Sequence, residues 1–195
     1  MNNYEYIIAG LPILSTDGRE TPDTEGILAD ISEQLSETDK KTLGFLLDSY
    51  DPEKLDAAFY KKAEKHSNRF IRDYFKYDLG VRNAKVEYLN RNLGRPGSAD
   101  IVNPDPEQEL PEFERREEVD SILEGNDILA RERGLDDFYW KVVDELTVMD
   151  VFDLNIILAF VVKLKMVERW IHLDEATGRD LFRKLVKEIK ENRNI

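Results

Sequence analysis

A short polar pattern that suits helix ends occurs twice in this chain. In each copy an aspartate is followed five positions later by an asparagine and thirteen positions later by a basic residue, and the copies lie 72 positions apart. Aspartate and asparagine side chains accept hydrogen bonds from the free amide groups of a first helical turn. We therefore expect each copy to end one helix and cap the next, with the two asparagines in equivalent places. The matching residues are Asp78, Asn83 and Arg91 in the first copy, and Asp150, Asn155 and Lys163 in the second.

Residues that carry catalysis or hold cofactors are few. The chain contains no cysteine, which excludes a thiolate nucleophile and a cysteine-ligated zinc site. Its two histidines, His66 and His172, are not part of the Glu-x-x-His pairs that a di-iron helical bundle needs. The sequence also lacks a phosphate-binding loop, a dinucleotide fingerprint and a nucleophile elbow. We expect a non-catalytic protein that holds no metal or cofactor and does not bind ATP by itself.

Charge is divided between two segments of the sequence. The net charge is −13, but residues 60–96 carry ten basic and four acidic side chains, whereas residues 101–150 carry sixteen acidic and five basic ones. The overall acidity disfavours nucleic-acid binding, and no nucleic-acid fold signature is present. The simplest interpretation is that these are solvated helix faces, which meet opposite charge on this chain or on a partner. The candidate partner-binding residues are Lys61, Lys62, Lys65, Glu114, Glu117 and Glu118.

Apolar residues recur at helical spacing along most of the chain, and no segment shows the sustained alternation of a half-buried strand. This pattern predicts an all-α fold. Residues 4–9 fit either a strand or a helical turn, and the segment Ser36-x-x-Asp39 is a weak capping box before a short apolar helix. Asp51 and Pro52 suit the start of a long helix that ends near the first copy of the pattern. For the last helix, Asp174 is the expected cap, and the apolar stripe is Leu181, Phe182, Leu185, Val186 and Ile189.

A stretch rich in proline and glycine separates the two copies. Residues 94–112 contain four prolines and show no helical periodicity, as is typical of a loop. We therefore expect an internally duplicated helical bundle with two repeat-like lobes. The N-terminal lobe would be residues 1–93 and the C-terminal lobe residues 113–195, with one copy of the pattern in each.

Nothing in the sequence indicates export or membrane insertion. The first residues lack the basic region and apolar run of a signal peptide. The longest apolar run, residues 156–162, is far shorter than the ~20 residues that a membrane-spanning helix needs. We expect a cytoplasmic protein that reaches a membrane only through its partners.

The duplicated pattern resembles the C subunit of V-type and archaeal-type rotary ATPases, whose eukaryotic counterpart is the d subunit. The whole chain is more closely similar to a bacterial family of unknown function whose genes lie among V-type ATPase genes. The chain departs from the rotary ATPase pattern at Gly80 and Phe152, where that family has an aspartate, and it has room for only two of the usual three repeats. The residues that carry the resemblance are Asp78, Asn83, Ala84 and Arg91, then Asp150, Asn155, Ile156 and Lys163, with the opening Tyr4-x-Tyr6-Ile7-x-Ala9.

The resemblance implies a mechanical function without catalytic residues. A protein of this kind is a helical socket on the cytoplasmic face of the membrane. Its partners are the rotor shaft subunits and the membrane proteolipid ring, between which it passes torque during ion transport. Segmented charge suits such docking, because complementary potentials orient partners as they meet. The alternatives are a soluble helical adaptor or regulator unrelated to rotary ATPases, and an uncharacterised enzyme.

Overall fold

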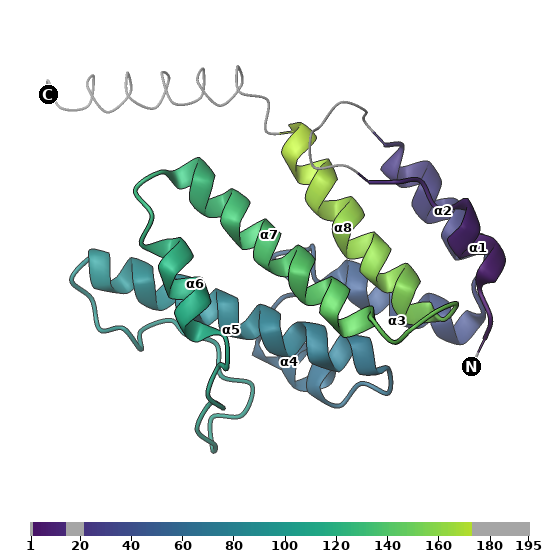
Figure 1. Ribbon diagram of the computed structural model, residues 1–195. Helices are drawn as coiled ribbons and strands as arrows, with labels where there is room; N and C mark the ends of the chain where they lie inside the picture. Colours follow the sequence, from purple (N-terminus) through teal and green to yellow (C-terminus); the bar gives the residue numbers. More distant parts are fainter. Residues whose placement is uncertain (1, 15–21, 173–195) are drawn as a thin grey trace, which may run out of the picture.

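The computed structural model of the protein describes residues 2–14 and 22–172, apart from the side chains of residues 171 and 172. Within this part the chain forms eight α-helices and no strand, which confirms the all-α prediction. The longest are α5, α7 and α8, and α7 and α8 lie side by side in Figure 1. The helices are α1 (Glu5–Gly10), α2 (Thr24–Gln34), α3 (Glu37–Asp48), α4 (Ala57–Glu64), α5 (Arg69–Asn92), α6 (Arg116–Leu123), α7 (Ile128–Thr147) and α8 (Leu154–His172).

Polar side chains fix where several of these helices start. The Ser36 hydroxyl accepts a hydrogen bond from the amide of Asp39 at 3.2 Å and donates one to the Asp39 carboxylate at 2.9 Å, so the cap predicted for α3 is present. Asn68 and Asp127 cap α5 and α7 through their own side-chain oxygens. Each cap satisfies amide groups that the first helical turn leaves without a partner.

The prediction of one long helix that starts at Asp51 is wrong. The Asp51 carboxylate accepts a hydrogen bond from the amide of Glu53 at 3.1 Å inside a turn, and helix α4 starts only after Asp56, which caps the amide of Phe59 at 2.7 Å. A second cap at Asn68 then starts α5 as a separate helix. The later aspartate and asparagine therefore outcompete the Asp-Pro signal, because each has a free helical amide within reach.

The first copy of the duplicated pattern does not form a helix break. Asp78 and Asn83 lie inside α5, which runs without interruption from Arg69 to Asn92. The second copy separates α7 from α8, as predicted. Because only one copy has the expected local structure, the two do not superpose as helix, break and helix. The internal duplication is not confirmed.

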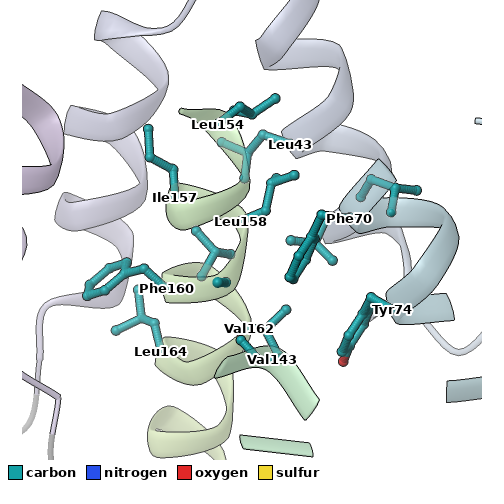
Figure 2. Packing of buried hydrophobic residues seen from close by; sticks show 14 of the residues in the cluster. Leu43, Phe70, Tyr74, Val143, Leu154, Ile157, Leu158, Phe160, Val162 and Leu164 are labelled. Carbon is teal, nitrogen blue, oxygen red and sulfur yellow. The ribbon is translucent and has the colours of Figure 1, made fainter. Parts of the chain in front are cut away.

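Helix α8 lies in the middle of the main core, as Figure 2 shows. Its apolar run at residues 156–162 is buried on most sides, with α2, α3 and α7 packed around it. An apolar helix face shielded in this way contributes roughly 25 cal/mol for each Å² removed from water. Members of this core include Leu43, Phe70, Tyr74, Val143, Leu154, Ile157, Leu158, Phe160, Val162 and Leu164.

A second, smaller core lies between α5, α6 and α7. It contains Val81 and Ala84 from α5, and its other members come from α6 and α7, which follow the loop at residues 94–112. The main core likewise mixes residues from before and after the loop. The division into lobes 1–93 and 113–195 stays a prediction, but side chains from both stretches share each core. The remaining members of the smaller core are Val119, Leu123, Leu135, Phe138 and Val142.

The segment from residue 93 to residue 115 joins α5 to α6 without forming a helix, as its proline and glycine content predicts. The predicted last helix, with Asp174 and the stripe from Leu181 to Ile189, lies outside the described residues. None of the helices in the described ranges is both long enough and apolar enough to cross a membrane.

Candidate functional site

Asp78 is a buried carboxylate at the meeting point of three helices. It accepts a hydrogen bond from the Tyr60 hydroxyl on α4 at 2.5 Å and another from the Tyr139 hydroxyl on α7 at 2.9 Å. The Nε of Arg82, one turn further along α5, donates a third at 2.8 Å. A buried charge is tolerated when it is paired and hydrogen-bonded. This aspartate therefore joins α4, α5 and α7 from inside the fold.

The electrostatics around Asp78 favour fixed hydrogen bonds over proton transfer. Burial and the Asp78 carboxylate raise the pKa of Tyr60 and of Tyr139 above the usual range, so both hydroxyls stay protonated. Partial burial opposes the charge of Arg82, but the Asp78 carboxylate outweighs this effect and raises the pKa of Arg82. At neutral pH the three partners are therefore donors, which is the arrangement of a structural anchor.

Next to Asp78 is a cavity of about 530 Å³ between α5, α7 and α8. Four acidic and four basic side chains line it, so its formal charge is balanced. In its wall, Lys85 on α5 forms an ion pair with Glu132 on α7 at 3.1 Å. Lys165 and Glu168, both on α8, form another at 2.8 Å. Arg169 holds Asp136 at 2.6 Å. Charged side chains line the cavity beside apolar ones, but these charges already have partners on the protein.

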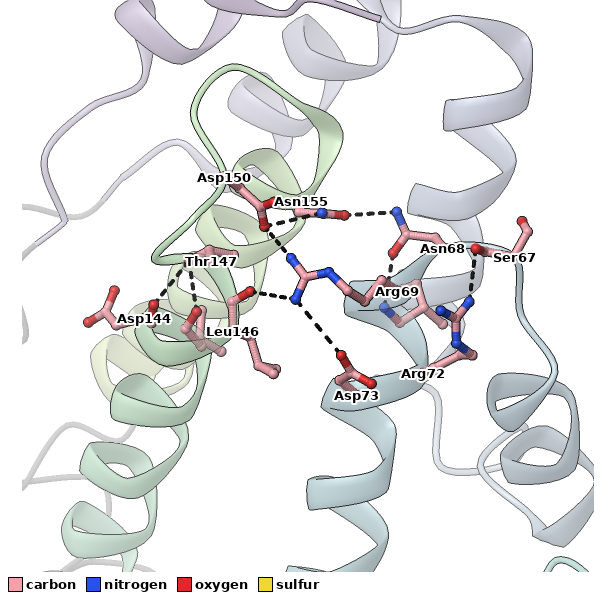
Figure 3. A network of polar contacts seen from close by, with 12 residues as sticks. Ser67, Asn68, Arg69, Arg72, Asp73, Asp144, Leu146, Thr147, Asp150 and Asn155 are labelled. Carbon is pink, nitrogen blue, oxygen red and sulfur yellow. Dashed lines mark hydrogen bonds and ion pairs between the residues drawn. The ribbon is translucent and has the colours of Figure 1, made fainter. Parts of the chain in front are cut away.

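The second copy of the pattern builds a different polar centre, at the turn between α7 and α8. Figure 3 shows Arg69, the first residue of α5, reaching across to this turn. Its guanidinium donates to the carbonyl of Leu146 at 3.0 Å and to the Asp150 carboxylate at 2.7 Å. The Asn155 side chain donates to the same carboxylate at 3.2 Å, and its oxygen accepts a hydrogen bond from the side-chain NH₂ of Asn68 at 2.9 Å. The starts of α5 and α8 are thereby tied to the end of α7.

Asn83 holds the long loop instead of capping a helix. Its side chain donates to the carbonyl of Val102 at 2.9 Å and accepts from the amide of Val102 at the same distance. In the last turn of α5, the Asn90 side chain donates to the carbonyl of Ala99 at 2.5 Å. The prediction that Asn83 occupies a place equivalent to Asn155 is therefore wrong, because Asn83 has a backbone partner on the loop that Asn155 lacks.

The basic member of each copy makes an ion pair with a neighbouring helix. Arg91 on α5 lies 3.8 Å from Asp120 on α6. Lys163 on α8 pairs with Asp144 on α7, and its ammonium group lies 4.6 Å from the centre of the Trp140 ring. In this one respect the two copies behave alike, because both basic residues join neighbouring helices.

The predicted partner-binding residues lie on the surface, but several have partners within the chain. Lys61 is 3.9 Å from Asp105, Glu114 is 3.2 Å from Lys76, and Glu118 pairs with Arg115 at 2.6 Å. The basic segment 60–96 therefore lies against the acidic segment 101–150, which accounts for part of the charge division. Lys62, Lys65 and Glu117 are exposed.

His66 does not have the surroundings of a metal ligand. Its Nδ1 accepts a hydrogen bond from the amide of Asn68 at 3.1 Å, and its ring lies 5.1 Å from that of Phe45. Partial burial, followed by the charge of Arg72, lowers the pKa of His66, which keeps the ring neutral at neutral pH. Among the residues that the structure describes, no three His, Asp or Glu side chains lie together in a group that could hold a metal ion.

Two features of these centres were not predicted from the sequence. One is the set of side chains that bind Asp78, and the other is the exposure of apolar side chains on the turn between α7 and α8. The spacing of Asp78 and Arg82, four positions apart, is a helical ion-pair signal that could have placed both inside one helix. Tyr60 and Tyr139 carried no such local signal, because they lie far from Asp78 in the sequence.

Comparison with known families matches residues 52–193 to a family of proteins of unknown function, DUF2764. The chain belongs to this family. Comparison with curated proteins and with solved structures gives no match. The DUF2764 region begins just before α4 and includes both Asp78 and Asp150, whereas α1, α2 and α3 precede it. Both polar centres are therefore built mainly from side chains of the family region.

Proposed function

We propose that this DUF2764 protein is a non-catalytic helical subunit that works by binding other proteins. The assembly that we propose for it is the central stalk of a V-type rotary ATPase, where it couples the rotor shaft to the membrane proteolipid ring during ion transport. This places it at the cytoplasmic face of the membrane, held there by its partners. Neither a cofactor nor nucleic acid has a part in this function.

The observation that carries the proposal is the way α5 is braced along its length. Arg69 ties its start to the turn between α7 and α8, Lys85 pairs with Glu132 on α7, and Arg91 lies near Asp120 on α6. Exposed ion pairs add only about 0–1 kcal/mol each to stability. Their effect here is to hold one long helix in a fixed relation to its neighbours. A protein that passes torque between two partners needs such a body.

The rotary ATPase part of the proposal is supported by the sequence resemblance. Arg91 and Lys163, the basic members of the two copies, each join neighbouring helices, as bracing positions of a rigid helical body would. The acidic net charge of −13 suits docking against basic partner surfaces, because opposite potentials steer and orient association.

A second candidate is a soluble helical adaptor unrelated to rotary ATPases. It is favoured by one observation: Asp78 and Asn83 lie inside α5, so the pattern that carries the resemblance does not have the same local structure twice. A binding protein with a single undivided set of helices has no need of an internal repeat.

Co-purification separates the two candidates. The tagged protein would be expressed in its native cells, the membranes solubilised gently, and the captured proteins identified by mass spectrometry. We expect shaft and ring subunits of the V-type ATPase among them. Failure to capture any subunit of the V-type ATPase, under conditions that keep the rest of the motor intact, would favour the independent adaptor. Calorimetry with ATP should detect no binding to the isolated protein, and stoichiometric micromolar binding would contradict this expectation.

A further inference from the structure

The turn between α7 and α8 exposes apolar side chains next to one another. Val148 is 75% exposed, Met149 is 86% exposed and Val151 is 64% exposed, while Phe152 is 41% exposed. We refer to these four residues as the apolar tip. Single exposed apolar side chains are ordinary, whereas neighbouring exposed apolar side chains are typical of interaction sites.

The apolar tip is held in place by the polar centre around Asp150. Arg69 binds both the carbonyl of Leu146 before the tip and the carboxylate of Asp150 within it. On the other side, the amide of Tyr4 donates to the carbonyl of Phe152 at 2.7 Å. The fold therefore fixes these apolar side chains facing outward. A surface that is already ordered loses less conformational entropy when it binds.

A shallow depression of about 920 Å³ lies beside the tip. Its charged side chains are Asp39, Asp150 and Asp153, against the single cation Arg69. The helix starts that face it are capped: Ser36 accepts from the amide of Asp39, and Asn68 accepts from the amide of Ile71. The amides that these caps bind are therefore not free to bind an anion.

The end of α7 adds to the acidity of this face. Asp144 and Glu145 come just before the tip, and their side chains are 59% and 53% exposed, although Lys163 and Arg115 pair with them. The surroundings of the tip are thus apolar at the centre and mainly acidic at the edge. A complementary surface is apolar at its centre and basic at its edge.

We propose that the apolar tip and the depression beside it form a docking surface for a partner protein that offers an apolar groove edged by lysine or arginine. This inference rests on the proposal that the protein acts by binding other proteins, and it names the surface and the partner's chemistry. A second copy of this chain is a poorer occupant, because two acidic faces and two net charges of −13 repel. An anionic lipid surface is disfavoured for the same reason.

The absence of cysteine from the sequence allows a clean test. A Met149→Cys variant labelled with a polarity-sensitive fluorophore reports burial of the tip, and a Ser121→Cys variant on α6 is the labelling control. The probes are purified shaft subunits and purified ring of the V-type ATPase. We expect a blue shift with one of these probes from the label at position 149 and none from the label at position 121.

Affinity measurements with unlabelled variants complete the test. Val148→Asp with Met149→Asp should weaken binding at least about tenfold, because truncating central apolar contacts dominates the loss of affinity at interfaces. The matched control is Ile128→Asp with Leu129→Asp. This second exposed apolar pair starts the 20-residue helix α7, roughly 30 Å from the tip, and its change should leave binding within about twofold. Circular dichroism checks that both double variants remain helical.

Each other outcome overturns the inference. If the wild-type protein binds a probe and the tip variant binds it equally well, the apolar tip is not the docking surface, and the proposed function stands. If the wild type binds neither probe, the proposed function fails and the inference fails with it. A shift of the position 149 label only with vesicles of phosphatidylcholine and phosphatidylglycerol would assign the tip to a membrane surface. Self-association in light scattering that the tip variant abolishes would assign it to a second copy.

Discussion

Asp78 and Asp150 hold equivalent positions in the same sequence pattern, yet they stabilise the protein in different ways. Asp78 is buried inside α5 and binds side chains from α4 and α7. Asp150 lies in the exposed turn between α7 and α8, where its carboxylate accepts hydrogen bonds from Arg69 and Asn155. An aspartate followed five positions later by an asparagine therefore does not by itself start a helix. The residues around it decide whether the amides nearby are free or already bonded within a helix.

The largest expected difference between the two centres is the cost of losing the carboxylate. Asp78→Ala leaves the buried Tyr60 hydroxyl and the partly buried Tyr139 hydroxyl without their acceptor, and at about 1–3 kcal/mol for each unsatisfied donor we expect a loss of about 2–5 kcal/mol. Asp150→Ala should cost only about 1 kcal/mol, because Arg69 and Asn155, the side chains that donate to it, are both partly exposed and can bind water instead. Urea unfolding followed by circular dichroism measures both free energies. Equal losses would mean that the two centres do not differ in this respect.

Asn83 and Asn155 give the next comparison. Asn83→Ala removes two hydrogen bonds to Val102 and should cost about 2 kcal/mol, at roughly 1 kcal/mol for each bond. It should also speed cleavage of the loop by a protease, since Val102 is then no longer fastened to α5. Asn155→Ala is the matched control, and it should leave the rate of loop cleavage unchanged. Limited proteolysis with mass spectrometry reads out the cleavage sites, and unchanged cleavage in Asn83→Ala would contradict the fastening.

The third comparison concerns Gly80, which stands where the second copy has Phe152. A Cβ at position 80 would lie 2.5 Å from the Phe113 ring, so Gly80→Ala should destabilise the protein by about 1–2 kcal/mol. Gly44→Ala in α3 is the control, because nothing lies within 4 Å of its added Cβ. It should stabilise the protein by up to about 1 kcal/mol through helix propensity. Thermal unfolding of both variants measures the effects, and a stabilising Gly80→Ala would show that Phe113 moves aside at little cost.

The smallest expected effect is a pH dependence at the second centre. Burial, followed by the charge of Asp150, raises the pKa of Asp153, so the folded state holds this proton more tightly than the unfolded chain does. Its contribution to stability is present below the ordinary aspartate pKa of about 3.9 and is lost as the pH rises through the raised value. Asp153→Asn keeps an acceptor for the amide of Asn155 and removes this loss. Relative to wild type, the variant should therefore gain stability between acid and neutral pH, by less than about 1 kcal/mol.

Urea unfolding of Asp153→Asn and wild type across this pH range measures the gain. Asp23→Asn is the control. Asp23 also caps a helix, α2, but it does not belong to the α7–α8 turn that carries Asp150 and Asp153. A constant difference between Asp153→Asn and wild type at every pH would contradict a raised pKa of Asp153.

The fold class followed from the sequence because apolar periodicity is a local property. The cap at Ser36 and the loop at residues 94–112 were predictable for the same reason, since each depends on neighbouring residues alone. The uninterrupted α5 was not, because the side chains that engage Asp78 and Asn83 come from α4, α7 and the loop. At the second copy, local signals sufficed to place the turn between α7 and α8. Its outward-facing apolar side chains depend on Arg69, which lies 81 positions from Asp150 in the sequence.

Two asparagines on α5 fasten only one part of the long loop, at Ala99 and Val102. Between Val102 and the start of α6, the chain can therefore change length without disturbing these bonds. Lengthening a flexible loop costs little, since each doubling adds only about 0.6 kcal/mol of closure entropy. The stretch around Pro106 is thus where insertions are best tolerated. In an alignment of DUF2764 proteins, gaps should gather here, and the spacing from Asn83 to Val102 should stay constant.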